Sequence, residues 1–309
     1  MSGALQAVVA AELAAPVPEA IREAAAQLAA RGGAGVEGVL FYGSSLRTGD
    51  LEGVLDFYVI VDQLKDWAIG PVLGFSCLLL PPFVEYAEIP VEGRLLRAKV
   101  AVLTGAQFAD LVRPQSINTT VWARFSQPAG LLWMRDETAR QRLSGIIADA
   151  VASAAGWAYA LGPVEGTAED YWRALFSHTY RAELRVERHD GRSADIVAHG
   201  GARYTALLPL AWQRLDLSYE AGEAGLLKKT GTPPVQFQGW GTRAFWGKPL
   251  NLARLVKAAF TFRNGAAYLA WKIERHSGVA LNLTPWQLRH PILMAPALLW
   301  RLWRRGVVR

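Results

Sequence analysis

One stretch, residues 39–62, constrains the fold of this chain more than any other: VLFYGSSLRTGDLEGVLDFYVIVD. It contains two runs of β-branched and aromatic residues, at 39–42 and 54–61, separated by a polar segment with three glycines. Runs of this composition, bounded by turn residues, predict two neighbouring buried strands. The second run carries a carboxylate, Asp56, and a charge inside a buried strand is costly unless it is paired or holds a metal. The strand pair is therefore expected to carry a polar site.

The turn Gly43-Ser44-Ser45, which follows the first run, predicts a binding site for an anion. Backbone N–H groups and hydroxyls in such a turn converge on a phosphate, and a helix that begins there adds a partial positive charge. Asp56 on the neighbouring strand offers an oxygen ligand for Mg²⁺ that faces the phosphate. This arrangement favours nucleotidyl or phosphoryl transfer. The alternative is a hairpin with a glycine-rich connection and a satisfied carboxylate.

A second strand pair is predicted at residues 83–89 and 94–103. Lys99 lies within its apolar second run and is a candidate to face a triphosphate. The alternative is a buried stem whose ammonium reaches solvent. Glu85 and Glu88 are candidates to complete a metal site with Asp56. They are three positions apart, so on a regular strand they face opposite sides and at most one is expected to be a ligand.

The segments YGSS, LDFYVIVD and Lys65-Asp66-Trp67 resemble the mitochondrial-type phosphatidate cytidylyltransferases (CDP-diacylglycerol synthases), within the DNA-polymerase-β-type nucleotidyltransferase superfamily. The superfamily usually has a second carboxylate two residues after the first, where this chain has Tyr58, and in the subfamily a hydrophobic residue also follows Asp-Phe. Three later blocks, at residues 85–112, 120–130 and 177–190, extend the resemblance over roughly residues 36–208. Arg124 and Arg185 match arginines in the last two blocks.

The resemblance implies an α+β fold, in which a nucleotidyltransferase-like mixed β-sheet with covering helices is followed by a helical domain and a C-terminal amphipathic helix. It also implies that CTP and phosphatidate react to give CDP-diacylglycerol and pyrophosphate, with Mg²⁺ on Asp56. Residues 43–45 would hold the triphosphate and Lys99 would offset its charge. Arg124 and Arg185 are candidates for the lipid phosphate. Cytidine and phosphatidate come from the resemblance alone, because the spacing of the motifs supports only phosphoryl or nucleotidyl transfer.

The composition limits the partners of the chain. Its 309 residues are 51% hydrophobic and 19% charged, include 12 Trp, and carry a net charge of +6. This balance suits an anionic bilayer or a nucleic acid. No RNA-binding motif or aromatic stacking platform is recognisable, so a nucleic-acid partner is not expected. A single cysteine, Cys77, excludes an intrachain disulfide and a multi-cysteine metal site.

Four regions are expected along the chain: a catalytic domain at 1–130, a helical domain at 131–218, a linker at 219–247 and C-terminal helices at 248–309. Asp136 is predicted to begin a long helix. The oligomeric state is left open.

Two apolar segments bear on membrane binding. Residues 67–84 carry no charge, and they form either a buried loop with a short helix or an apolar lip that contacts acyl chains. Residues 284–309 are predicted to form a helix that begins at Thr284 and lies in the headgroup region of a membrane. The alternative is a helix docked on the core or on a second subunit. The residues expected to associate with the membrane are Trp286, Arg289, Trp300, Arg301, Trp303, Arg304 and Arg305.

The sequence favours a peripheral enzyme at the cytoplasmic face of a membrane. One alternative is a nucleotidyltransferase that acts on a soluble small molecule, a protein or RNA. Another is an inactive relative that serves as a membrane-bound scaffold, which Tyr58 in place of a carboxylate supports.

Overall fold

The two apolar runs around Gly43 form neighbouring strands, as the sequence predicts. In the computed structural model, β1 (Val36–Tyr42) and β2 (Val54–Val61) pair antiparallel, with Tyr42 opposite Asp56. The structure describes residues 3–182, 197–198, 200–277, 283–284 and 286–287.

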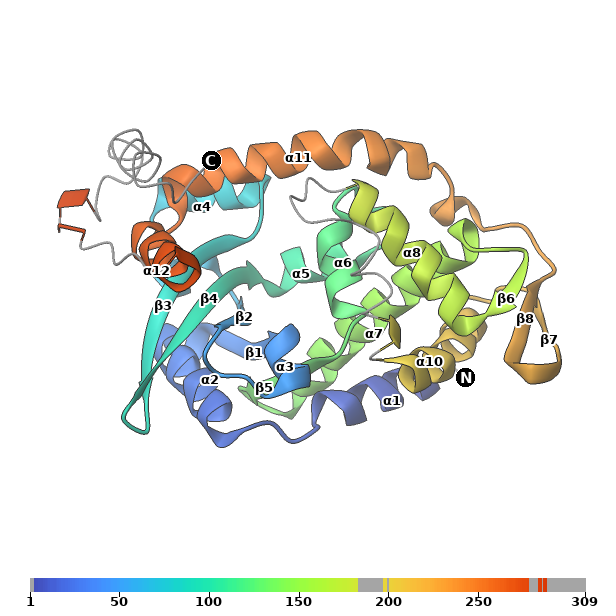
Figure 1. The fold of residues 1–309 in the computed structure, drawn as a ribbon, viewed down its shortest axis with the longest axis horizontal. Helices are drawn as coiled ribbons and strands as arrows, with labels where there is room; N and C mark the ends of the chain where they lie inside the picture. The colour runs from blue at the N-terminus through green and yellow to red at the C-terminus, as the bar shows by residue number, and fades with distance from the viewer. Residues whose placement is uncertain (1–2, 183–196, 199, 278–282, 285, 288–309) are drawn as a thin grey trace.

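A five-stranded sheet is built around this pair. Its other strands are β3 (Phe83–Val91), β4 (Arg94–Thr104) and β5 (Ala129–Met134), and the order across the sheet is β3-β4-β2-β1-β5. The contact between β2 and β4 is parallel, whereas the other contacts are antiparallel. The mixed sheet and its covering helices confirm the α+β class and the predicted second strand pair (Figure 1).

Successive side chains of β2 point to opposite faces of the sheet, because a strand has a period of two residues. Phe57 and Val59 belong to the hydrophobic cluster under α2 (Glu19–Gly32). Tyr58 and Ile60 belong to the cluster on the opposite face. That face is covered by a group of helices centred on α7 (Glu137–Leu161), which we call the helical part. Asp56 shares the face of Tyr58, so the strand period places its carboxylate between the sheet and the helical part.

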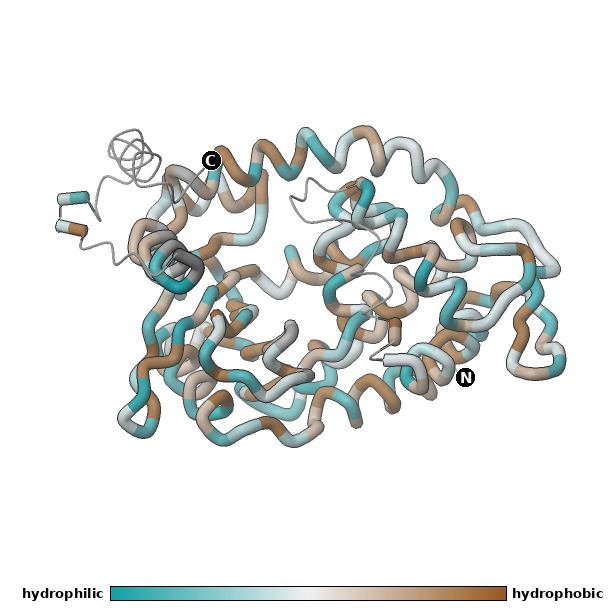
Figure 2. Tube along the Cα trace, in the orientation of Figure 1, coloured by the Kyte–Doolittle hydropathy of each residue, from teal (hydrophilic) through white to brown (hydrophobic). Residues whose placement is uncertain are grey.

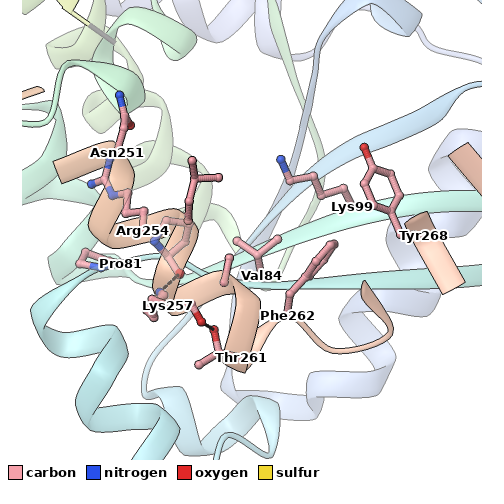
Figure 3. Close-up of a pocket in the computed structure, with 12 residues that line it drawn as sticks. Pro81, Val84, Lys99, Asn251, Arg254, Lys257, Thr261, Phe262 and Tyr268 are labelled. Atoms are coloured by element: carbon pink, nitrogen blue, oxygen red, sulfur yellow. Dashed lines mark hydrogen bonds between the residues drawn. The ribbon is translucent and has the colours of Figure 1, made fainter. Parts of the chain in front are cut away.

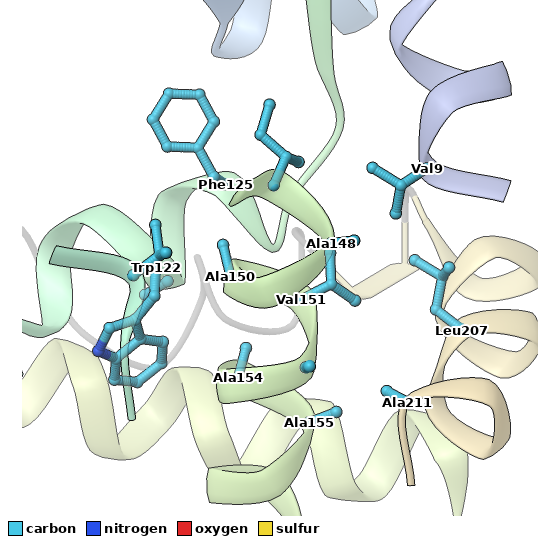
Figure 4. Close-up of a cluster of buried hydrophobic side chains, with 14 of the residues drawn as sticks. Val9, Trp122, Phe125, Ala148, Ala150, Val151, Ala154, Ala155, Leu207 and Ala211 are labelled. Carbon is cyan, nitrogen blue, oxygen red and sulfur yellow. The ribbon is translucent and has the colours of Figure 1, made fainter. Parts of the chain in front are cut away.

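Helix α7 (Glu137–Leu161) forms the centre of the helical part. Asp136 caps it, as predicted, and its carboxylate accepts a hydrogen bond from the N–H of Ala139. Small side chains such as Ala154 let α1, α6 and α10 pack closely against it (Figure 4). The other helices described here are α1 (Gly3–Leu13), α3 (Ser44–Thr48), α4 (Pro71–Leu79), α5 (Gly105–Val112), α6 (Thr119–Phe125), α8 (Ala168–Ala182), α10 (Gly201–Arg214), α11 (Trp240–Thr261) and α12 (Gly265–Ser277).

The observed elements depart from the predicted domain boundaries. The boundary after residue 130 falls inside β5, and one hydrophobic cluster extends on both sides of it. The predicted linker at 219–247 contains β7 (Tyr219–Ala221) and β8 (Leu226–Lys229), which form a three-stranded sheet with β6 (Glu165–Thr167). Strands this short were missed because the segment is rich in turn residues.

Helix α11 crosses the molecule from α8 to β3 and lies along one long side of it (Figure 1). Helix α4, within the uncharged segment 67–84, lies beside its C-terminal half. The interpretation of this segment as buried core is wrong for α4, because Val72 is 81% exposed and Phe75, Leu78 and Leu79 are also exposed. Within the described residues, no helix has both the length and the apolar character needed to cross a bilayer.

Candidate functional site

The pairing of β1 with β2 places Asp56 beside the aromatic end of β1. The hydroxyl of Tyr42 hydrogen bonds to the Asp56 carboxylate, and both residues line a cavity of about 160 Å³. Gly43 follows Tyr42 with a φ of +107°, a conformation that favours glycine. A Cβ at this position would lie 3.4 Å from Oδ2 of Asp56, so the predicted turn does approach the carboxylate.

Three cations surround this cavity. Lys99 of β4 is in register with Asp56 on the neighbouring parallel strand, and Arg124 comes from α6. Arg254 reaches the cavity from α11, almost 200 residues after Asp56 in the chain. Among the described residues that line the cavity, Asp56 is the single carboxylate. The cavity therefore carries an excess of positive charge and suits a ligand with several negative charges.

Burial raises the pKa of Asp56, while Lys99, Arg124 and the hydrogen bond from Tyr42 lower it in part. The pKa remains above the ordinary value for an aspartate. Burial also raises the pKa of Tyr42 well above its ordinary value, so its hydroxyl stays protonated and donates to the carboxylate at neutral pH. Burial thus makes the charged form of Asp56 energetically costly, and perturbed pKa values of this kind are common at functional sites.

Tyr58 lies two residues after Asp56 on β2, so it shares the face of the sheet that carries Asp56. Its side chain is 2% exposed, and its hydroxyl accepts a hydrogen bond of 2.7 Å from Nη1 of Arg124. The guanidinium of Arg124 also lies over the ring of Tyr42, at 4.8 Å from the ring centroid. Tyr58 therefore adds no second negative charge next to Asp56, and it holds the guanidinium of Arg124 in place.

Asn118 contributes a hydrogen-bond donor that the sequence did not indicate. Its side-chain oxygen accepts from the N–H of Thr120 at 3.0 Å, which caps α6, and from Nη1 of Arg254 at 2.9 Å. Its Nδ2 is buried and has no hydrogen-bond partner within the described residues, although Asn118 lines the cavity. A buried donor without a partner is costly, and an acceptor oxygen of a ligand would satisfy it.

A second cavity, of about 350 Å³, adjoins the first. The two share Lys99, Asn251 and Arg254 in their linings, and also Pro82 and Val84. The remainder of the larger cavity is mostly apolar, formed by side chains such as Leu255 and Phe262. Figure 3 shows Val84 and Lys99 of the sheet, Tyr268 of α12, and Arg254 and Lys257 of α11 around this cavity. A cationic compartment thus continues into an apolar one.

The two predicted additional metal ligands do not meet Asp56. Glu85 points to the opposite face of the sheet, where its buried carboxylate pairs with Arg31 of α2. This placement contradicts its predicted role. Glu88 is exposed, accepts a hydrogen bond of 3.0 Å from the hydroxyl of Tyr86, and does not line either cavity.

The donors around Asp56 determine how a magnesium ion would fit. Across the described part of the chain, no group of three or more His, Cys, Asp or Glu side chains is placed to hold a metal ion. Mg²⁺ in nucleotide sites is commonly held by one or two carboxylates together with substrate phosphates and water. Asp56 is one such carboxylate, and a Mg²⁺ ion beside it would take its other ligands from nucleotide phosphates and water.

Several other predicted residues can now be placed. Ser45 is buried near the turn, whereas the side chain of Ser44 lies outside what the structure describes. Arg185 also lies outside the described residues, as do all the predicted membrane-associating residues except Trp286, whose side chain is exposed. Thr284 and Gln287 exchange reciprocal hydrogen bonds at the predicted start of the C-terminal helix.

The sequence indicated Asp56, Lys99 and Arg124, which line the smaller cavity, but did not single out several polar residues beside them. Among these are Tyr42, Asn118, Asn251 and Arg254. Tyr42 adjoins the recognised turn, so its position on β1 was a usable signal. The other three lie far from the turn in sequence, in no motif.

A scan of known protein families finds no match for this sequence, and a search of curated proteins finds none. Among solved structures, a nucleotidyltransferase-like protein from Exiguobacterium sibiricum 255-15 is similar over 94% of this chain and 92% of that chain, with 10% sequence identity and a TM-score of 0.28. Similarity at this level assigns no residue roles. The geometry of the cavities alone carries the functional argument.

Proposed function

We propose that this protein is a peripheral membrane nucleotidyltransferase that makes CDP-diacylglycerol and pyrophosphate from CTP and phosphatidate. The observation that carries the proposal is the pair of adjoining cavities. One places a single carboxylate among Lys99, Arg124 and Arg254, and the other is mostly apolar. Phosphate groups suit the first cavity, and the apolar part of a lipid suits the second. The choice of cytidine and phosphatidate rests on the family resemblance.

In this reaction an oxygen of the phosphatidate phosphate forms a bond to the α-phosphorus of CTP. The bond from the α-phosphorus to the oxygen that bridges to the β-phosphorus breaks, and pyrophosphate leaves with that electron pair. Positioning and charge stabilisation supply most of the catalysis in phosphoryl transfer. Lys99, Arg124 and Arg254 would offset the charge on the phosphates, and Nδ2 of Asn118 would donate to a phosphate oxygen. Mg²⁺ bound with the nucleotide would add positive charge, with Asp56 as its protein ligand.

The test is CDP-diacylglycerol formation from labelled CTP, with phosphatidate in mixed micelles and Mg²⁺. We expect product from the wild type and a loss of about 100-fold or more for Asp56→Asn, the scale observed when one group that stabilises transition-state charge is removed. Asp62→Asn is the matched control. This residue follows the same strand and pairs with Arg135 outside the cavity, so product formation should persist. Equal activity of the wild type and Asp56→Asn would contradict the role of Asp56.

Two other outcomes would redirect the proposal. If folded wild-type protein gives no product from phosphatidate but its melting temperature rises with a nucleotide and Mg²⁺, a soluble acceptor becomes the better proposal. If no nucleotide raises the melting temperature, the protein is better explained as an inactive relative. The buried Tyr58, in the place of a second carboxylate, is the observation that favours this last alternative.

A further inference from the structure

Helix α11 exposes the side chains that a surface helix normally buries. A helix on a soluble protein turns its apolar stripe towards the core and its charged residues towards water. In α11, Arg243 is 6% exposed, and Arg254 points into the cavities. Phe260 is 73% exposed, and it belongs to a stripe with Leu252 and Val256 at spacings of four residues. The helix is therefore amphipathic in the inverse sense.

The neighbouring helix α4 also exposes large apolar side chains. Its buried residue is Cys77, while Val72, Phe75, Leu78 and Leu79 form an exposed stripe along the other side. We call the large exposed hydrophobic residues of α4, together with those of α11 from Leu252 onward, the α4–α11 face. Its members are Val72, Phe75, Leu78, Leu79, Leu252, Leu255, Val256 and Phe260. An exposed apolar area of this kind marks a binding surface.

The two helices are fixed to each other at this face. The ammonium of Lys257 in α11 donates hydrogen bonds to the carbonyl oxygens of Leu80 and Pro82, which follow α4. The same ammonium lies 3.8 Å from Sγ of Cys77. Segments 180 residues apart in the chain are thus held side by side (Figure 1). Figure 2 shows brown, apolar positions recurring along α11 on the outer edge of the molecule.

The charge on these helices has one sign. Helices α4 and α11, of 9 and 22 residues, contain no Asp or Glu, although 27 of the 309 residues in the chain are acidic. They contain four basic residues, Arg243, Lys248, Arg254 and Lys257. Of these four, Lys248 is exposed, whereas the other three face inward. An apolar surface whose helices carry an exposed lysine and no carboxylate is compatible with an anionic lipid surface.

We infer that the α4–α11 face docks on an anionic bilayer and opens the apolar cavity towards its lipids. The inference extends the proposed function, on which the choice of phosphatidate as the lipid rests. Other occupants fit less well. Residues 284–309 include five arginines and no acidic residue, so this segment carries the same sign of charge as the face. A second copy would bring together two faces whose helices offer no carboxylate to pair with Lys248.

The larger cavity lies beside the α4–α11 face, so a docked protein could take up a lipid from the bilayer. Pro81 and Pro82 after α4, together with Leu255 and Ala258 of α11, line the cavity beside the face. Lys99 and Arg254 lie where it meets the smaller cavity. A lipid phosphate would move from the membrane towards cations while its acyl chains stay in apolar surroundings. The enzyme would then act on phosphatidate without extracting it fully into water.

The test uses the full chain with an environment-sensitive NBD dye on one cysteine at a time, in a Cys77→Ser background. Phe75→Cys reports on α4 and Val256→Cys on α11. Leu95→Cys and Val164→Cys are matched controls, because these apolar residues are also exposed but lie in the β3–β4 hairpin and beside β6. Phosphatidylcholine vesicles with phosphatidate should raise NBD emission several-fold and shift it to the blue at positions 75 and 256 only. Vesicles of pure phosphatidylcholine should have a much smaller effect.

Three results would overturn the inference. Absence of vesicle binding is one, and binding without any change at positions 75 and 256 is another, because a different surface would then hold the membrane. The third is blue-shifted emission at both positions before vesicles are added. Reversal on dilution would then identify a second copy, and persistence would identify a segment of the same chain. If the labels enter the bilayer but no CDP-diacylglycerol forms, the docking surface stands and the proposed reaction fails.

Discussion

At the scale of single residues, Asp56 is the group on which the proposed reaction depends, and its burial lowers the stability of the folded protein at neutral pH. Its pKa is raised by burial more than the neighbouring cations lower it, so the folded state binds a proton more readily than the unfolded state. Stability therefore falls as pH rises through the range between the ordinary pKa of aspartate and the raised value. A neutral side chain of the same shape would avoid this loss.

We expect Asp56→Asn to unfold at a higher temperature than the wild type near pH 8, even though it loses activity. The difference should shrink as pH falls through the raised pKa and vanish below about pH 3, where the carboxylate is protonated in both states of the wild type. Thermal unfolding at a series of pH values measures this. Asp62→Asn, which loses an exposed ion pair with Arg135, should change stability by less than about 1 kcal/mol. Lower stability of Asp56→Asn at every pH would contradict the argument.

Tyr58 is expected to position Arg124 for the triphosphate. Tyr58→Phe removes the acceptor of the 2.7 Å hydrogen bond and should lower stability by about 1.5–3 kcal/mol, because the bond involves a charged group. It should also raise the KM for CTP, since the guanidinium is less fixed. Tyr171→Phe is the control. It loses hydrogen bonds to the carbonyls of Val164 and Leu227, so it should lower stability and leave the KM unchanged. An equal KM effect for both variants would show that Tyr58 acts through stability alone.

The sequence predicts the part of the site whose residues are close together along the chain. Gly43 directly follows β1, Asp56 lies on the adjacent strand β2, and Lys99 lies on the next strand of the sheet, so alternation and turn residues suffice to place them. Arg254 and Asn118 meet only because α11 packs across the mouth of the cavity, 136 residues later in the chain. Glu85 was misassigned because its partner, Arg31, lies on a helix whose packing the strand pattern does not reveal.

At the scale of elements, two glycines of α7 differ in whether the structure has room for a side chain at their positions. Gly156 is buried against the ring of Phe237, which has no room for a Cβ, whereas a Cβ at Gly145 would meet Gln6 in ordinary van der Waals contact. Glycine at position 156 permits close packing, whereas glycine at position 145 only weakens the helix.

We expect Gly156→Ala to lower the free energy of unfolding by about 1–3 kcal/mol, because Phe237 is buried and packs against Trp157. Gly145→Ala should raise it by about 0.5–1 kcal/mol, the gain expected when alanine replaces glycine inside a helix. Urea denaturation of both variants gives the two values. The same sign for both substitutions would mean that the packing around position 156 relaxes more easily than the structure indicates.

The sequence predicted a linker where α11 begins because residues 219–247 are rich in turn residues, and the inverse amphipathicity of the helix misled the choice of its buried side. An apolar stripe predicts the buried side of a helix, but here Leu252 and Phe260 are exposed and Arg243 is buried. Periodicity identifies a helix and its two sides, whereas the side that faces the protein depends on what else is available to cover it. The uncharged segment around α4 left the same choice open.

At the scale of the whole molecule, the net charge of +6 should make membrane binding depend on salt. Raising the ionic strength screens the attraction between basic residues and anionic lipids, but it leaves the burial of apolar side chains intact. We expect co-sedimentation with phosphatidate vesicles to weaken several-fold between low and high NaCl without being abolished. Complete loss at high salt would show that the apolar residues do not enter the bilayer. No effect of salt would show that charge does not contribute.

The crossing of α11 over the sheet also orders events during synthesis. The sheet is complete once Met134 has been made, but Asn251 and Arg254 follow more than 100 residues later. At roughly 5–20 residues per second, a ribosome needs about 10–40 s to pass from Asp56 to Arg254. A nascent chain therefore displays its carboxylate long before the last cation arrives. The C-terminal half of the protein thus sets the moment at which the anion site is complete.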